Sequence, residues 1–220
     1  MAYKAALFDL DGVVFDTESQ YTNFWGSVGK QYFPAQPDFA ERIKGSTLVQ
    51  IYDRYFKGET EKQQTITKAL DDFERTMDYA YIPGFCEFIR SLRANGIKTA
   101  VVTSSNIAKM ENVYRAHPEF KCLFDAILTS EDFDKSKPDP DCYLKASQRF
   151  CFQPDECVGF EDSINGLKAV KAAKMICVGL TTTNPEEVVA EYADIVIDNY
   201  LTDGDVNARE RYNKVWRLFV

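Results

Sequence analysis

Histidine is almost missing from this chain, because His117 is the only one among its 220 residues. A zinc site rich in histidine is therefore excluded, and any Ser-His-Asp or Cys-His scheme would have to use this one residue. His117 stands between a helical pattern and Pro118, which places it in a loop or at a helix end. Carboxylate chemistry is the main class of mechanism that remains.

Long apolar runs and paired cysteines are missing too. No apolar stretch approaches the roughly 18 residues that cross a bilayer, and Asp9 and Asp11 interrupt the first apolar run too early for a signal peptide. The six cysteines are scattered without a Cys-x-x-Cys pair, so we expect buried free thiols. These absences favour a cytoplasmic protein that has no membrane partner.

Positive charge is in deficit, since the formal net charge is −8. Such a balance disfavours nucleic acid or an anionic membrane surface as a partner. It leaves room for a phosphorylated substrate, because a local cation and a few lysines can outweigh the average field. The length and the 45% hydrophobic content suit one medium globular domain or a core domain that carries an insertion.

Short apolar runs alternate with helical patterns from about residue 85 onward. Five runs have the length and β-branched composition of buried strands: 99–102, 126–128, 157–160, 176–178 and 195–197. Helical patterns fall between them, near 84–94, 106–116, 140–150, 164–173 and 185–191. Together with an opening strand at 5–8, this alternation predicts an α/β fold with a doubly wound parallel sheet.

Residues from 17 to about 80 interrupt the alternation. They hold helical patterns near 18–31, 38–55 and 61–79 and no convincing strand. Their aromatic side chains fall at spacings that make apolar helix faces, so we expect helix packing rather than a ligand cage. This segment is predicted to be a helical insert after the first strand. The tail beyond residue 200 is expected to form a short helix or an added strand.

Two carboxylates, Asp9 and Asp11, follow the first apolar run and precede a turn at Gly12. Ligands of open α/β sheets bind at the carboxyl ends of strands, and a spacing of two directs both side chains the same way. Their repulsion is relieved by a hard cation such as Mg²⁺, beside which a carboxylate can attack phosphorus. The alternative is a solvated acidic turn.

Hydroxyl side chains follow the strand expected at 99–102. Thr103 and Ser104 stand between the end of that strand and the start of the next helix. The free N–H groups and hydroxyls at a helix N-terminus can bind phosphate oxygens. Plain N-capping by Ser105 or Asn106 is the alternative.

Charged side chains follow the next two predicted strands. Lys137 lies in a proline-rich loop after 126–128, where a fixed ammonium can neutralise phosphate and separate crowded carboxylates. Glu161 and Asp162 end the strand at 157–160, and either can complete the coordination of a cation held by Asp9, directly or through water. The alternatives are a solvated loop lysine and a helix cap at Asp162 or Ser163.

Taken together, these segments resemble the four ordered motifs of the haloacid dehalogenase superfamily: Asp9-Leu10-Asp11-Gly12-Val13, Thr103-Ser104, Lys137-Pro138 and Glu161-Asp162-Ser163. The match covers roughly residues 4–198. The full run from Asp9 to Glu18 and the segment Lys44-Gly45-Ser46-Thr47 look like its β-phosphoglucomutase-like branch. The resemblance implies a Rossmann-like core domain, 1–16 and 81–220, with an inserted helical cap domain at 17–80.

The resemblance also implies a role for each motif residue. Asp9 would be the nucleophile that forms an aspartyl-phosphate, and Asp11 the general acid and then the base. Mg²⁺ would be held by the Asp9 side chain, the Asp11 carbonyl and Asp162, with Glu161 in support. Phosphoryl oxygens would be bound by Thr103, Ser104 and Lys137. The cap loop that faces the substrate would be formed by Lys44, Gly45 and Ser46.

Asp11 favours a phosphatase or phosphomutase, because the dehalogenase branch typically lacks this second aspartate. Mutases of the β-phosphoglucomutase type typically have a histidine and an arginine where this chain has Tyr21 and Leu48. We therefore expect a Mg²⁺-dependent phosphatase acting on a small phosphorylated metabolite, such as a sugar phosphate. The alternatives are a hexose-phosphate mutase and a non-catalytic binding module. Lys174 also stands where this branch often has glycine.

Overall fold

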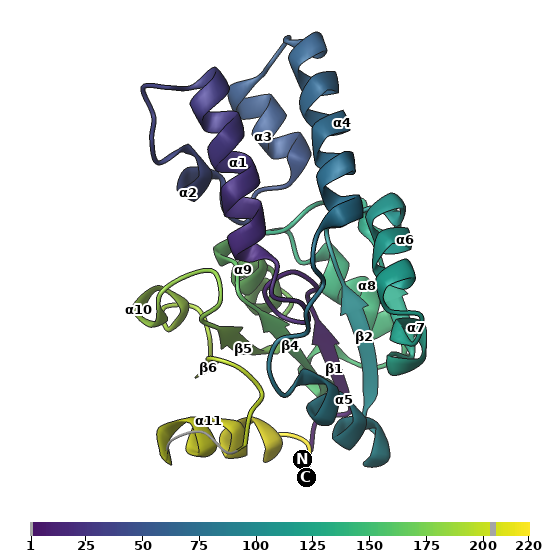
Figure 1. Cartoon of the computed structure of the whole chain (residues 1–220). Helices are drawn as coiled ribbons and strands as arrows, with labels where there is room; N and C mark the ends of the chain where they lie inside the picture. The colour runs from purple at the N-terminus through teal and green to yellow at the C-terminus, as the bar shows by residue number, and fades with distance from the viewer. Residues whose placement is uncertain (1, 203–205) are drawn as a thin grey trace.

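Residues 2–202 and 206–220 are described by a computed structural model of the chain. Within them, six parallel strands form one sheet in the order β3-β2-β1-β4-β5-β6 (Figure 1). The strands are β1 (Ala5–Phe8), β2 (Lys98–Val102), β3 (Ala126–Leu128), β4 (Cys157–Glu161), β5 (Ile176–Leu180) and β6 (Ile195–Ile197). Helices cover both faces, so the prediction of a Rossmann-like, doubly wound sheet is confirmed.

Alternate side chains of β1 point to opposite faces of the sheet and contribute to both layers of the core. Ala6 and Phe8 face a layer made by α5 (Phe85–Ala94), α6 (Ile107–Ala116), α7 (Phe120–Leu123) and α11 (Val206–Trp216). Ala5 and Leu7 face the other layer, made by α8 (Asp141–Arg149), α9 (Ile164–Ala172) and α10 (Glu186–Val189). Since β1 is buried on both faces, every one of its residues is apolar, as a central parallel strand requires.

The register of β1 decides which residues meet beyond the sheet. Phe8 pairs with Val101 of β2 on one side and with Phe160 of β4 on the other. The rings of Phe8 and Phe160 stack with their centroids 4.5 Å apart. The residues that follow these three strands therefore leave the sheet at one edge, and this edge is where the sequence motifs converge.

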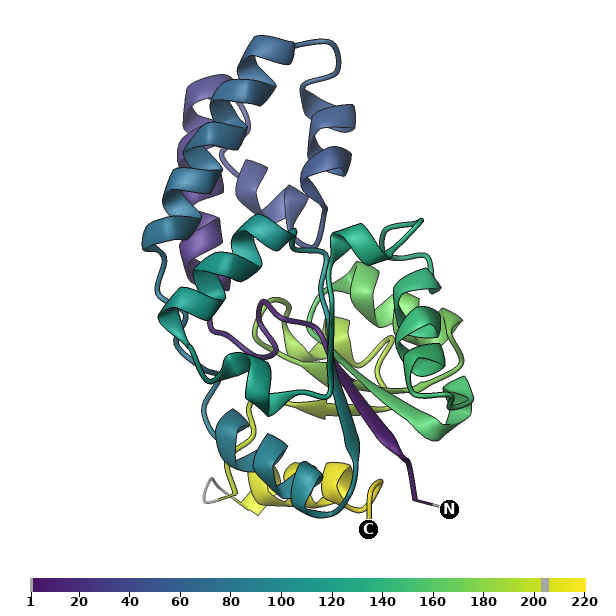
Figure 2. The same cartoon turned by 90° about the vertical axis from the view of Figure 1, so that its right-hand side faces the viewer.

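Four helices stand above that edge, as Figures 1 and 2 show: α1 (Glu18–Tyr32), α2 (Phe39–Ile43), α3 (Leu48–Tyr55) and α4 (Thr60–Thr76). Their aromatic and aliphatic faces form a separate apolar cluster around Trp25, Phe39, Ile51 and Phe56. This agrees with the helix packing expected for these aromatics. We call the four helices the cap, and the domain boundaries at residues 17 and 80 stay a prediction.

Two of the expected cap helices have different bounds. The pattern at 38–55 is split into α2 and α3, because Gly45 takes a left-handed φ of 70° and Thr47 caps a new helix. The pattern at 61–79 ends at Thr76, and Met77 is extended. An extended backbone lets both Met77 and Tyr79 insert into the apolar cluster of the core, where they are buried.

The remaining corrections concern the tail and the cysteines. Of the two expectations for the tail, the helix is correct: α11 packs beside β6 and buries Val215. Cys122 and Cys151 are exposed, contrary to the expected burial, because they lie on a short surface helix and in the turn after α8. No helix within the described residues is long and apolar enough to cross a membrane.

Candidate active site

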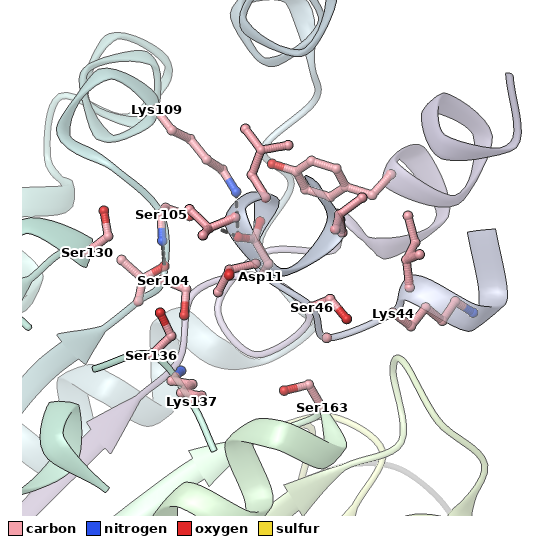
Figure 3. A pocket seen from close by; sticks show the side chains of 18 of the residues that line it. Asp11, Lys44, Ser46, Ser104, Ser105, Lys109, Ser130, Ser136, Lys137 and Ser163 are labelled. Atoms are coloured by element: carbon pink, nitrogen blue, oxygen red, sulfur yellow. Dashed lines mark hydrogen bonds and ion pairs between the residues drawn. The ribbon is translucent and has the colours of Figure 1, made fainter. Parts of the chain in front are cut away.

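A cavity of about 460 Å³ lies between the cap and the carboxyl edge of the sheet (Figure 3). It collects nine of the ten residues that the sequence singled out: Asp9, Asp11, Lys44, Gly45, Ser46, Thr103, Ser104, Lys137 and Asp162. The tenth, Glu161, is fully buried beneath the cavity. Residues up to 153 positions apart in the sequence thus meet in one place because parallel strands end at one edge.

Lys137 is a buried cation and not a solvated loop lysine. Its Nζ lies 2.6 Å from Oδ1 of Asp9, 2.6 Å from Oε1 of Glu161 and 3.0 Å from the carbonyl oxygen of Val102. Burial opposes the charged form, but the two carboxylates outweigh it and raise the pKa of Lys137 above its usual range. The ammonium therefore stays charged and holds Asp9 in place.

Glu161 is the anchor of that ammonium. Its two carboxylate oxygens also accept hydrogen bonds from the Tyr143 hydroxyl at 2.7 Å, the Asp162 backbone N–H at 3.3 Å and the Ser163 hydroxyl at 3.3 Å. Gly166 makes room for it, since a Cβ there would lie 1.9 Å from the Glu161 carboxyl carbon. Because both of its carboxylate oxygens are engaged, Glu161 supports the site from below and leaves contact with the cavity to Asp9 and Asp162.

Asp162 is a buried carboxylate that lacks a cationic partner among the described residues. It accepts hydrogen bonds from Thr183 Oγ1 at its side chain and from Asn184 Nδ2 at its carbonyl oxygen, the latter at 2.9 Å. Burial, followed by the charges of Glu18, Glu161 and Asp9, raises the pKa of Asp162 well above its usual range. Ser163, not Asp162, caps the next helix, because its hydroxyl accepts the Gly166 N–H at 3.1 Å.

The carboxylates Asp9, Glu161 and Asp162 form an acidic cluster in which one oxygen of each lies within 4.8 Å of the others. Burial raises the pKa of Asp9 to about 7, and Glu161 and Asp11 add to this effect while Lys137 opposes it. The single positive charge of Lys137 therefore does not balance the negative charge of the three carboxylates. A compact set of oxygen donors with excess negative charge fits a hard divalent cation.

Asp11 is held by three donors from three different segments. Thr17 Oγ1 lies 2.7 Å from one carboxylate oxygen, Ser105 Oγ lies 3.3 Å from the other, and Lys109 Nζ makes an ion pair with it. Lys109 is nearly inaccessible, with 4% of its side chain exposed, and it reaches Asp11 from α6 (Figure 3). Sequence reasoning missed Lys109, because a single lysine within a helical pattern carries no motif.

The segment after β2 caps the next helix with one residue and lines the cavity with others. Thr103 is buried at the cavity wall, and its hydroxyl accepts the Ser105 N–H at 3.0 Å. Asn106 caps α6, since its side chain accepts the Lys109 N–H at 2.8 Å. Ser104 is exposed to the cavity. Capping therefore falls to Asn106 and leaves Thr103 and Ser104 at the cavity wall.

The cap touches the core around the cavity. The Gly45 carbonyl oxygen accepts a hydrogen bond from Asn165 Nδ2 at 2.9 Å, and Gln50 Nε2 donates to the Lys137 carbonyl oxygen at 3.1 Å. On the other side, the Tyr21 ring lies 4.8 Å from Lys109 Nζ. These contacts close the cap over the cluster of carboxylates.

Tyr21 has its hydroxyl committed within the cap. It donates to Glu74 Oε1 at 2.8 Å, and burial raises the pKa values of both groups. The ring also packs against Phe73. The hydroxyl is therefore an anchor between α1 and α4 and not a free group in the cavity.

The family model of haloacid dehalogenase-like hydrolases, which describes the sequences of that family, matches residues 3–174 of this chain. The chain belongs to this family. Its order of motifs, its Rossmann-like sheet and its inserted helices agree with that membership, and the predicted β-phosphoglucomutase-like branch is confirmed by the relatives below.

Three curated relatives illustrate the range of the family. Validoxylamine A 7'-phosphate phosphatase from Streptomyces hygroscopicus subsp. limoneus is 28% identical, over 89% of this chain and 93% of that protein. Beta-phosphoglucomutase from Bacillus subtilis is 27% identical, over 89% and 92%. Protein SUPPRESSOR OF QUENCHING 1, chloroplastic, from Arabidopsis thaliana is 25% identical over 94% of this chain, which spans only 21% of that protein's length.

The crystal structure of CbbY from Rhodobacter sphaeroides in complex with phosphate has the same fold. It superposes with a TM-score of 0.73 at 24% identity and covers 94% of this chain and 99% of that one. At this identity the similarity supports the fold, and the chemistry has to be argued from the residues of this chain.

Proposed function

We propose that this protein is a Mg²⁺-dependent phosphatase that hydrolyses a small phosphorylated metabolite, such as a sugar phosphate, through an aspartyl-phosphate on Asp9. The observation that carries the proposal is the position of Lys137, whose ammonium lies 2.6 Å from both Asp9 and Glu161. Phosphoryl transfer needs positioning and charge neutralisation above all. A buried cation beside a held carboxylate, in a cavity at the strand ends, supplies both.

The residues present fit a magnesium ion. The Asp9 side chain, the Asp11 carbonyl oxygen and Asp162 would hold it, with Glu161 in support through Lys137 and its neighbours. The fit rests on Asp162, which is buried without a cationic partner in the described part of the chain. When bound, the ion would neutralise charge on the phosphoryl group and on the crowded carboxylates.

Asp9 and Asp11 divide the reaction between them. Lys137 binds Oδ1 of Asp9, and no described group bonds the other oxygen, which is free to attack phosphorus as the bond to the alcohol breaks. To act as the general acid, Asp11 has to release its ion pair with Lys109 and take up a proton. It then gives that proton to the departing alcohol and later takes one from the water that hydrolyses the acyl phosphate. Thr17 and Ser105 hold the Asp11 carboxyl toward the cavity.

The phosphoryl oxygens would be bound on the core side of the cavity. Thr103 offers its hydroxyl, Ser104 its backbone N–H and Lys137 its ammonium. All three line the cavity beside Asp9. The bound phosphoryl group would thus face neutral or positive donors, while Asp9 approaches along the remaining direction.

Hydrolysis is favoured over phosphoryl transfer between two positions of a sugar. A mutase must hold a bisphosphorylated intermediate and therefore needs a second phosphate anchor. The Tyr21 hydroxyl is already committed to Glu74, and Leu48 contributes no charge. Along residues 2–202 and 206–220, no arginine lines the cavity. The similarity to Beta-phosphoglucomutase makes the mutase the second candidate.

The proposal predicts that purified protein releases inorganic phosphate from members of a panel of phosphorylated metabolites when Mg²⁺ is present, and that EDTA stops it. Asp9→Asn should lower kcat by about 10³-fold or more, because the nucleophile is removed. Asp16→Asn is the matched control, since Asp16 is exposed in the same loop and does not line the cavity. Phosphate release that survives in Asp9→Asn would show that the nucleophile is wrongly assigned.

The same preparation decides between the two candidates. Incubation with β-glucose 1-phosphate and a trace of the glucose bisphosphate should give phosphate and glucose. Accumulation of glucose 6-phosphate that depends on Asp9 would instead identify a mutase.

A further inference from the structure

The cavity has two chemically different ends, and the end beneath the cap has to receive the alcohol part of the substrate. This inference rests on the proposed function, in which the phosphoryl group lies beside Asp9 and Lys137. The opposite end lies under α1, α3 and α4. Figure 3 shows Lys44 and Ser46 on the cap side of the cavity and Lys137 on the sheet side.

The positive charges of the cavity are all engaged with carboxylates. Lys109 is paired with Asp11, and Lys137 with Asp9 and Glu161. Lys44 lies 2.7 Å from a Glu41 oxygen, and Lys135 lies 3.4 Å from an Asp139 oxygen. No arginine lines the cavity in the described ranges, so a second anionic group of a substrate would have to compete with Glu41 or Asp139 for a lysine.

Negative charge remains on the cap side. Asp71 of α4 lines the cavity and forms no ion pair with any described residue. Glu18, at the start of α1, lies instead beside the acidic cluster, where its charge acts on Asp162. Glu74, also of α4, accepts the Tyr21 hydroxyl and is buried. An anion placed beside these carboxylates would be repelled, whereas an ammonium group would be attracted.

The rest of the cap end is apolar, with a few neutral hydroxyls. Its apolar lining comes from all four cap helices: Trp25, Ala40, Ile43, Leu48, Ile51 and Leu70. Thr22 and Ser46 contribute hydroxyl groups. An apolar wall with few polar groups is suited to the carbon face of a ring or chain whose hydroxyls are bound at its rim.

We propose that the substrate is the monophosphate of a neutral or amine-bearing alcohol, and that the cap end rejects alcohols with a second phosphate or a carboxylate. The apolar wall accepts the carbon skeleton, the carboxylates of α4 favour an ammonium, and the pairing of every lysine in the cavity disfavours a second anion.

The experiment compares matched substrates on the alcohol scaffold that gives the fastest phosphate release in the panel. For a hexose, the set is glucose 6-phosphate, glucosamine 6-phosphate, 6-phosphogluconate, and fructose 6-phosphate beside fructose 1,6-bisphosphate. We expect kcat/KM for each anionic member to be lower by about 10-fold or more than for its neutral partner, and the amine to be at least as good as the neutral sugar. An anionic member that reacts as fast as its partner would overturn the proposal.

A cation introduced into the cap end should reverse the discrimination. Leu48→Arg and, independently, Thr22→Lys should each raise the ratio of kcat/KM for anionic over neutral substrates by about 10-fold. Gln64→Arg is the matched control, because Gln64 is exposed on α4 outside the cavity and its change adds the same charge. An unchanged ratio in both cavity variants would show that the alcohol does not occupy this end.

The two proposals fail in different ways. If no substrate in the panel gives phosphate release that depends on Asp9, the proposed function is overturned. Asp9-dependent release with a preference for bisphosphates or carboxylates would leave the phosphatase in place and overturn only the substrate class.

Discussion

Asp9 and Glu161 share one ammonium group, and their other contacts decide which of them can react. Glu161 has both oxygens engaged by Lys137, Tyr143, the Asp162 N–H and Ser163. Asp9 has one oxygen bound by Lys137 and the other free of bonds to the described residues. At the scale of single residues, these contacts support the proposal that Asp9, the carboxylate with the fewer partners, is the nucleophile.

Single residues were predictable where they follow strands and unpredictable where only packing brings them in. Asp9, Thr103 and Asp162 were found because parallel strands end at one edge, and Lys137 because it follows β3 in a proline-rich loop. Lys109 lies 98 positions from Asp11, in the first turn of α6. Its approach depends on how α6 is placed against the loop that carries Asp11, which no local pattern encodes.

Lys174 gives a prediction at this scale. It has a left-handed φ of 63°, a conformation that glycine adopts readily and that costs a residue with a Cβ free energy. This conformation explains why the glycine that this branch often has here would suit the position. Lys174→Gly should raise the free energy of unfolding by up to about 1 kcal/mol, measured by urea denaturation, because relief of roughly 1–2 kcal/mol of left-handed strain is partly offset by the entropy that glycine loses. Lys174→Ala, which keeps the Cβ, should give no such gain, and a glycine variant less stable than the alanine variant would contradict the argument.

At the scale of elements, periodicity found nearly all of the strands and helices of the sheet domain, because burial on one or both faces imposes it. The same signal failed between residues 38 and 55, where two amphipathic helices follow each other. Gly45 and the pair Thr47 and Gln50 mark the break, since a threonine followed three residues later by glutamine forms a capping box. That local chemistry, and not the period, was the signal to use.

Gln50 connects the start of α3 to the loop that carries Lys137, which gives a prediction for this element. Its Oε1 accepts the Thr47 N–H at 2.9 Å and its Nε2 donates to the Lys137 carbonyl oxygen at 3.1 Å. Gln50→Ala removes both bonds and should lower the free energy of unfolding by about 1 kcal/mol and also raise KM. Gln50→Glu keeps the capping acceptor but lacks the donor.

The glutamate variant therefore separates the two roles. Urea denaturation should show that it retains most of the stability that the alanine variant loses, whereas its KM should rise like that of the alanine variant. A normal KM in both variants would mean that the bond to Lys137 has no part in holding the cap over the cavity.

At the scale of the whole molecule, cap and core enclose a site that neither could form alone. The core supplies the carboxylates and Lys137, and the cap adds Glu18 and the lining of α3 and α4. The sequence predicted both parts, but not their contacts, because a contact between two parts has no period along the chain. Seven carboxylates and four lysines line the cavity that results. The protein without a bound cation therefore carries uncompensated repulsion between Asp9, Asp162 and their neighbours.

This repulsion predicts how Mg²⁺ changes the stability of the whole chain. An ion that binds only the folded state at a concentration of 100 times its Kd adds about 2.7 kcal/mol, and Tm rises by several degrees for a protein of this size. Asp162→Asn removes one buried charge, so it should raise Tm in EDTA and reduce the increment on adding Mg²⁺. Asp16→Asn, at an exposed position outside the cavity, should behave as the unmodified protein. Scanning calorimetry of the three proteins in EDTA and in Mg²⁺ tests both the higher Tm of Asp162→Asn in EDTA and its smaller increase of Tm with Mg²⁺. If Mg²⁺ leaves the Tm of the unmodified protein unchanged, a cation site at the acidic cluster is ruled out.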